Sequence, residues 1–167
     1  MRKIEDRRIA TPDVAVPTEE NGAPFRRVLV LVESFTASTK ALSLAARIGQ
    51  SRGGPLRVVH VRMWDRAMPL CGGRFYPETS EQATMILDSA MTFVWARGVE
   101  ASGVVIEAER SRIAAAVIAE ASRWGADVIV LTARPRHFFT PGMWEKTTNR
   151  VMRASFCPVL SVYPRLK

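Results

Sequence analysis

The residue types best suited to binding chemistry gather in one basic stretch, 134–153, near the C-terminal end of the chain. Five bases stand there against one acid, Glu145, so the net charge of the stretch is +4 with His137 counted as neutral. Such a density of cations can hold a phosphorylated ligand or a nucleic-acid backbone, and it can equally be the solvated face of a basic protein. The five cations are Arg134, Arg136, Lys146, Arg150 and Arg153.

Three aromatic residues, Phe138, Phe139 and Trp144, lie between these bases. Aromatic side chains among cations can stack on nucleotide bases. They can also close a loop over a sheet or fill a subunit interface, and Phe138 with Phe139 could then occupy the space of a purine. We favour this second interpretation.

Motifs for catalysis and metal binding are absent from the sequence. It contains no HExxH, no CxxC, no GxxxxGK[ST] phosphate loop, no GxSxG and no GxGxxG. His60 lies between Val59 and Val61, which favours a structural histidine over a catalyst. We therefore predict no catalytic residue and no metal, and we expect no obligatory cofactor.

Composition indicates a globular, cytoplasmic protein. The 167 residues carry a net charge of +8, with 47% hydrophobic and 24% charged residues. No apolar run approaches the ~18 residues of a membrane span, and the first residues lack the apolar core of a secretory signal. Two cysteines, Cys71 and Cys157, cannot build a disulfide framework; we expect Cys157 to be buried and Cys71 to be exposed.

Strands and helices are expected to alternate through the chain from residue 25 onward. Aliphatic runs predict strands, and capping residues such as Ser34 and Ser111 begin helices between them. Five strands separated by four helices require crossover connections, which gives an open doubly wound α/β sheet. The strands are expected at 28–32, 56–61, 104–108, 127–131 and 158–163, the helices at 34–52, 80–98, 111–125 and 144–154, and the long loops at 62–79 and 132–143.

Residues 1–24 differ from the rest of the chain. They contain three prolines, no apolar period and a net charge of −1. We predict a flexible N-terminal tail over 1–24 and one folded domain over 25–167.

Four strings of this domain stand out: VLVLVESFTASTKALSLAARIG, PLRVVHVR, GADVIVLTARPR and NRVMRASFCPVLSVYP. Together they cover about 26–163. Their order and spacing, more than any one of them, resemble the universal stress protein family.

The resemblance implies a five-stranded parallel sheet in the order 3-2-1-4-5, with helices on both faces. A crevice then lies where the order reverses, which places Glu33 and Ser34 opposite Thr132 and Arg134. Many family members bind ATP there, using a carboxylate after the first strand and the signature G-x2-G-x9-G-[ST] after the fourth. The family commonly forms dimers through the last strand, which implies a homodimer along Val159 to Tyr163.

The glycine signature is not kept in this chain. Thr132, Pro135 and Glu145 stand at its three glycine positions, and Lys146 stands at the hydroxyl position. Proline has no N–H for a phosphate oxygen, and Glu145 would repel the phosphates. We therefore expect that ATP is not bound in the family's usual mode. The candidate ligand-binding residues of the crevice are Glu33, Ser34, Thr132, Arg134, Arg136, Lys146 and Thr147.

Three functions stay open at this stage. The preferred hypothesis is a non-catalytic binding module of the stress response, which acts through an unknown protein partner or a small ligand at the crevice. The second is an adenine-nucleotide binder, with ATP held by a modified phosphate loop. The third is association with nucleic acid, motivated by a pI near 10.5. We predict no membrane partner.

Overall fold

A computed structural model describes residues 25–66, 73–133 and 143–163. The predicted flexible tail over 1–24 lies outside the described residues. In chain order the elements are β1 (Val28–Val32), α1 (Phe35–Arg52), β2 (Leu56–Arg66), β3 (Arg74–Phe75), α2 (Ser80–Trp95), β4 (Ala101–Glu109), the 3-10 helix η1 (Arg110–Arg112), α3 (Ile113–Trp124), β5 (Val128–Thr132), α4 (Met143–Ala154) and β6 (Val159–Val162).

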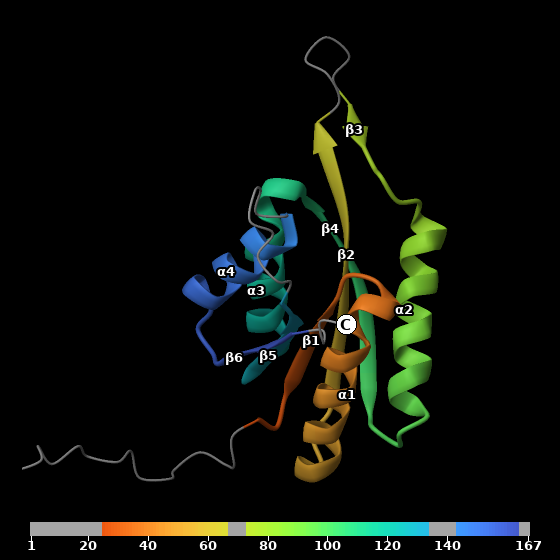
Figure 1. Cartoon of the computed structure of the whole chain (residues 1–167), viewed down its shortest axis with the longest axis vertical. Coiled ribbons are helices and arrows are strands. Elements are labelled where there is room, and N and C mark those ends of the chain that lie inside the picture. Colours follow the sequence, from red (N-terminus) through yellow and green to blue (C-terminus); the bar gives the residue numbers. More distant parts are fainter. Residues whose placement is uncertain (1–24, 67–72, 134–142, 164–167) are drawn as a thin grey trace, which may run out of the picture.

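The parallel strands follow the order β4-β2-β1-β5-β6, and β3 adds a short antiparallel pair to the end of β2. Helices cover both faces of the sheet: α1 and α2 lie on one side, and α3 and α4 lie on the other (Figure 1). The doubly wound α/β fold predicted from the sequence is confirmed. The sheet is mixed rather than wholly parallel, because β3 pairs antiparallel with β2, and no pattern in the sequence predicts β3.

The two central strands carry the core. Every residue of β1 and β5 is buried, which suits aliphatic runs that have helices on both sides. Along β1 the side chains alternate between the layers: Val30 packs with α1 and α2, and Leu31 packs with α3 and α4. This alternation fixes the register of the two central strands. Because the strands of the main sheet are parallel, their C-terminal ends lie together along one edge of the sheet, which is called its C-terminal edge below.

The expected loop over 62–79 is wrong in its first part, because β2 continues to Arg66 and then pairs with β3. The extension over 62–66 holds three charged residues, a methionine and a tryptophan, so no aliphatic run marks it. It is held by side chains: the Arg74 guanidinium lies 4.5 Å from the Trp64 ring, and that of Arg62 lies 4.0 Å from the Tyr76 ring. In Figure 1 the extended end of β2, together with β3, forms an arm that projects beyond the rest of the sheet.

Helix starts agree with the sequence at α1 and differ at α3. Ser34 caps α1, since its hydroxyl accepts from the Ala37 N–H at 3.3 Å. Ser111 was expected to cap α3, and this expectation is wrong: Ser111 lies inside η1, and α3 begins at Ile113 without a side-chain cap. The 3-10 turn displaces the helix start by two residues.

Candidate functional site

At the reversal of strand order, hydrogen bonds tie the end of β5 to α1 and α4. Thr132 is 5% exposed, and its hydroxyl donates to the Ala37 carbonyl in the first turn of α1 at 3.4 Å. Its own carbonyl accepts from the Thr148 hydroxyl of α4 at 3.4 Å. The first glycine position of the family signature is therefore filled by a residue whose buried, branched side chain bonds α1 and whose backbone carbonyl bonds α4.

Glu33 and Ser34 form the turn from β1 into α1. The Glu33 N–H donates to the buried Ser38 hydroxyl at 3.0 Å. Glu33 itself is half-buried. The Ser34 hydroxyl is engaged as the helix cap. Their use by a ligand stays a prediction.

Arg134 and Arg136 lie outside the described residues, as do Pro135, Cys71 and the aromatic pair. The predicted roles of these residues therefore stay predictions.

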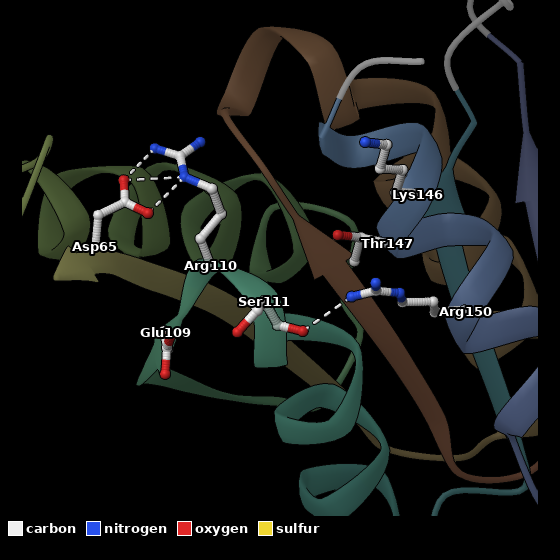
Figure 2. A pocket seen from close by; sticks show the side chains of 7 residues that line it. All are labelled: Asp65, Glu109, Arg110, Ser111, Lys146, Thr147 and Arg150. Carbon is white, nitrogen blue, oxygen red and sulfur yellow. Dashed lines mark hydrogen bonds and ion pairs between the residues drawn. The ribbon is translucent and has the colours of Figure 1, made fainter.

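A pocket of about 380 Å³ opens at the C-terminal edge of the sheet, on the side of β2 and β4. Figure 2 shows that its walls come from separate elements: the end of β2, the end of β4 with η1, and one side of α4. The lining residues are Asp65, Glu109, Arg110, Ser111, Lys146, Thr147 and Arg150.

One wall of the pocket is an ion pair between Asp65 and Arg110. The Arg110 Nε lies 2.8 and 2.9 Å from the two carboxylate oxygens, and its Nη2 lies 2.6 Å from Oδ2. Hydrogen bonds from Arg110 lower the pKa of Asp65, and the same bonds raise the pKa of Arg110. This pair ties the end of β2 to the turn after β4, so that the wall carries two charges of opposite sign.

The opposite wall is one face of α4. Lys146 is exposed, Thr147 is 4% exposed, and Arg150 follows one helical turn after Lys146. The Arg150 Nη1 donates to the Ser111 carbonyl at 2.9 Å, which links α4 to η1 across the pocket (Figure 2). Among the described residues, neither cation has an ion-pair partner.

The charges of the pocket favour an anion. Three bases and two acids line it, and both acids face bases: Asp65 pairs with Arg110, and Glu109 lies 3.8 Å from Arg66. Among the residues that the structure describes, Lys146 and Arg150 are then the two pocket cations without an ion-pair partner. A small ligand with one or two negative charges could be held by their side chains together with the hydroxyl of Thr147.

His60 is buried at 2% exposure. Its Nδ1 lies 2.9 Å from the Val32 carbonyl, and its Nε2 lies 2.9 Å from the Glu78 carboxylate. These bonds support the predicted structural role, because both ring nitrogens contact groups of the protein itself. Cys157, expected to be buried, is only partly buried: its Sγ lies 3.6 Å from the Ser155 hydroxyl.

Two of the predicted site residues, Lys146 and Thr147, line the pocket, and the sequence also singled out Arg150 as part of the basic stretch. It did not single out Asp65 or Arg110. Asp65 lies in the extended end of β2 and Arg110 lies in η1, and neither segment has a periodic pattern in the sequence. The two residues meet because β2 and β4 are adjacent. The available signal was that each charged residue follows a predicted strand within a few positions.

Over the described ranges, no group of three or more histidine, cysteine or acidic side chains is placed to hold a metal ion. Within the same ranges, no helix has the length and apolar character needed to cross a membrane.

The sequence matches the Universal stress protein family over residues 24–162. No curated protein matches the chain in sequence. Among solved structures, a universal stress protein from Archaeoglobus fulgidus aligns with a TM-score of 0.64 at 22% identity, covering 83% of this chain and 94% of its own. The universal stress protein of that organism in complex with dAMP gives 0.62 at 20% identity, covering 84% and 99%.

A more distant relative, a universal stress protein family protein from Arabidopsis thaliana with AMP bound, gives a TM-score of 0.57 at 14% identity, covering 83% of this chain and 92% of its own. These identities support the shared fold alone. The family match spans most of the chain and agrees with the sheet order described above. The chain belongs to the universal stress protein family.

Proposed function

We propose that this chain is a non-catalytic binding module of the stress response in the cytoplasm, which takes a small anionic ligand in the pocket between η1 and α4. The observation that carries the proposal is the placement of Lys146 and Arg150 on one face of α4, without ion-pair partners among the described residues. Thr147 between them supplies a hydroxyl, and the pocket volume of about 380 Å³ suits a small molecule.

The same proposal holds that ATP is not bound in the family's usual mode. A triphosphate nest needs backbone N–H groups that are free to approach phosphate oxygens. Thr132 fills the first glycine position with a buried side chain, and its hydroxyl and carbonyl are both engaged. Anion binding must then rest on side-chain cations.

An adenine nucleoside monophosphate is the second candidate. Neighbours of known structure carry dAMP, cAMP or AMP, each with a single phosphate. One phosphate can be held by two cations and a hydroxyl without a glycine nest. The two candidates share the anionic group and differ in whether the pocket also recognises a base.

A thermal-shift series on the full chain tests both candidates. The probes are inorganic phosphate, AMP, cAMP and ATP with Mg²⁺, each at millimolar concentration. We expect phosphate and AMP to raise the melting temperature. A rise with AMP well above that with phosphate indicates base recognition, and a rise with ATP alone contradicts the proposal.

Two variants make the test specific. Lys146→Ala removes a cation from the pocket and should abolish most of the shift. Lys40→Ala removes an equal charge from an exposed position on α1 and should leave the shift unchanged. Equal effects of both variants would mean that the probes respond to net charge, as in the weak salt-sensitive binding expected of a nucleic-acid-associating surface.

We further propose a homodimer through β6 and Tyr163. β6 pairs only with β5 among the described strands, and all four of its residues are partly exposed. Tyr163, directly after it, is 65% exposed. An apolar edge strand without charged residues is suited to antiparallel pairing with a second copy. Light scattering should give a dimer, and Leu160→Lys should shift it to a monomer.

A further inference from the structure

The contact between buried His60 and partly buried Glu78 has an unusual hydrogen-bond requirement. The Nδ1 of His60 contacts the Val32 carbonyl, which can only accept, so Nδ1 must donate. Its Nε2 contacts the Glu78 carboxylate at 2.9 Å, and an ionised carboxylate also only accepts. Both ring nitrogens therefore face acceptors.

One additional proton satisfies both contacts. It can lie on Nε2, giving an imidazolium beside a carboxylate, or on Glu78, giving a carboxylic acid that donates to neutral Nε2. In either form a single proton lies between Nε2 and Oε2. If it leaves for solvent, a lone pair faces a carboxylate at 2.9 Å in a place where His60 is only 2% exposed. That arrangement is repulsive, because neither atom can donate.

The groups around the pair hold its two sides in different ways. His60 is fixed inside the sheet, opposite Val32 of β1 and Val105 of β4. Glu78 is 20% exposed and precedes Thr79, the cap of α2, so its side chain can move to solvent. Loss of the proton would therefore release Glu78 rather than His60.

Other charged groups on this side of the sheet come from each neighbouring element. The Arg62 guanidinium donates to the Glu78 carbonyl at 3.1 Å and to Glu107 of β4 at 2.7 Å. The Tyr76 hydroxyl donates to the same Glu107 at 2.9 Å. Glu81, in the first turn of α2, has a lowered pKa from its own backbone N–H and the Thr79 hydroxyl, with a smaller effect of Arg62.

Charged residues of two other elements, the turn after β1 and helix α1, lie near the end of β1. They take part in none of the bonds to the imidazole described above. Glu33 follows β1 directly. The cations of α1 are exposed to solvent, and they are Lys40, Arg47 and Arg52. The proton between His60 and Glu78 thus distinguishes the state in which the two side chains are in contact from the state in which Glu78 is released.

We propose that His60 and Glu78 form a proton-operated latch between the start of α2 and the C-terminal end of β1. The latch is closed while the pair holds its proton, and it opens as the pH rises and the proton leaves. Because His60 keeps its bond to the Val32 carbonyl, opening frees the start of α2 while the end of β1 stays held. This inference goes beyond the proposed ligand and does not depend on it.

Nuclear magnetic resonance of the full ¹⁵N-labelled chain between pH 5.5 and 9.5 tests the latch. We expect the Nε2 signal of His60 and the backbone amides of 78–80 to move in one shared transition. After correction for the intrinsic pH dependence of exchange, hydrogen exchange of these amides should rise about 10-fold or more above the transition, as for a lost buried hydrogen bond. His137→Asn leaves one histidine and so assigns the ring signals.

Glu78→Gln separates the latch from general pH effects. Its amide N–H can donate to the Nε2 lone pair without any proton to lose, so the transition of the amides should disappear. Glu81→Gln is the matched control, which removes a carboxylate three residues away and should keep the transition. An amide transition that persists in Glu78→Gln would overturn the proposal, as would Nε2 without a proton over the whole range and unchanged amides at 78–80.

Discussion

Replacing Asp65 by asparagine should raise the affinity of the pocket for a small anion, although it removes an ion pair. The carboxylate neutralises Arg110 through contacts of 2.6 to 2.9 Å. The lining residues carry three bases and two acids, so Asp65→Asn changes the pocket from +1 to +2. Since Asp65 and Arg110 are 35% and 41% exposed, solvent screens the added charge, and we expect about a fivefold lower Kd.

The pH dependence of this variant follows from the lowered pKa of Asp65, which hydrogen bonds from Arg110 cause. A carboxyl group with a depressed pKa in the folded state contributes stability above its ordinary value of 3.8, and that contribution is lost as the pH falls through the lower folded value. At pH 6 to 8 Asp65 is therefore ionised throughout. The affinity gain of Asp65→Asn should be constant across this range.

Isothermal titration with sulfate, whose charge is constant at these pH values, measures the effect. Asp88→Asn is the control, because it removes an equal charge from an exposed position on α2. An unchanged or weaker affinity in Asp65→Asn would refute the reasoning that Arg110 is held neutralised at the pocket wall. An equal gain in Asp88→Asn would show that only net charge matters.

Three further substitutions test contacts that stabilise the fold around the site. Glu120→Ala leaves the Arg57 guanidinium, 2.9 Å away and 15% exposed, without its carboxylate, and should cost about 3 kcal/mol, seen in calorimetry as a melting temperature about 6–12 °C lower. Gly54→Ala would place a Cβ 1.8 Å from the Arg26 carbonyl oxygen; urea unfolding should show a loss of about 2 kcal/mol or more, and a loss under half of that would contradict the contact. Thr132→Val removes the bond to Ala37 at near-constant shape and should cost about 1 kcal/mol without creating ATP binding in a filter assay.

The parts of the fold that sequence could predict are those with a single strong local cause. β1 and β5 are aliphatic because helices cover both of their faces, and Ser34 marks a helix start through its own hydroxyl. The order of the parallel strands followed from resemblance rather than from periodicity. These features are confirmed because local pattern and tertiary packing agree in them.

The missed features depend on contacts between residues far apart in the chain. The extension of β2 is stabilised by stacking of arginines on aromatic rings, and the expected cap at Ser111 gave way to a 3-10 turn held by Arg110 and Asp65. Neither interaction has a periodic trace in the sequence. Two walls of the candidate pocket are built from those same segments, so they could not be predicted either. Lys146 could be placed through the family signature, and Thr147 follows it directly.

The replacement of glycines by side chains at this edge of the sheet changes what a ligand must provide. A nest of backbone N–H groups recognises the shape of successive phosphates, because its donors are fixed by the main chain. Lys146 and Arg150 are long, partly solvated cations, whose attraction depends on charge and falls as salt screens it. If the proposed pocket binds its ligand through these side chains, selectivity should follow the charge and size of the anion rather than the geometry of successive phosphates. Affinity for AMP should then fall several-fold between about 50 and 200 mM salt, whereas recognition by a backbone nest would change little.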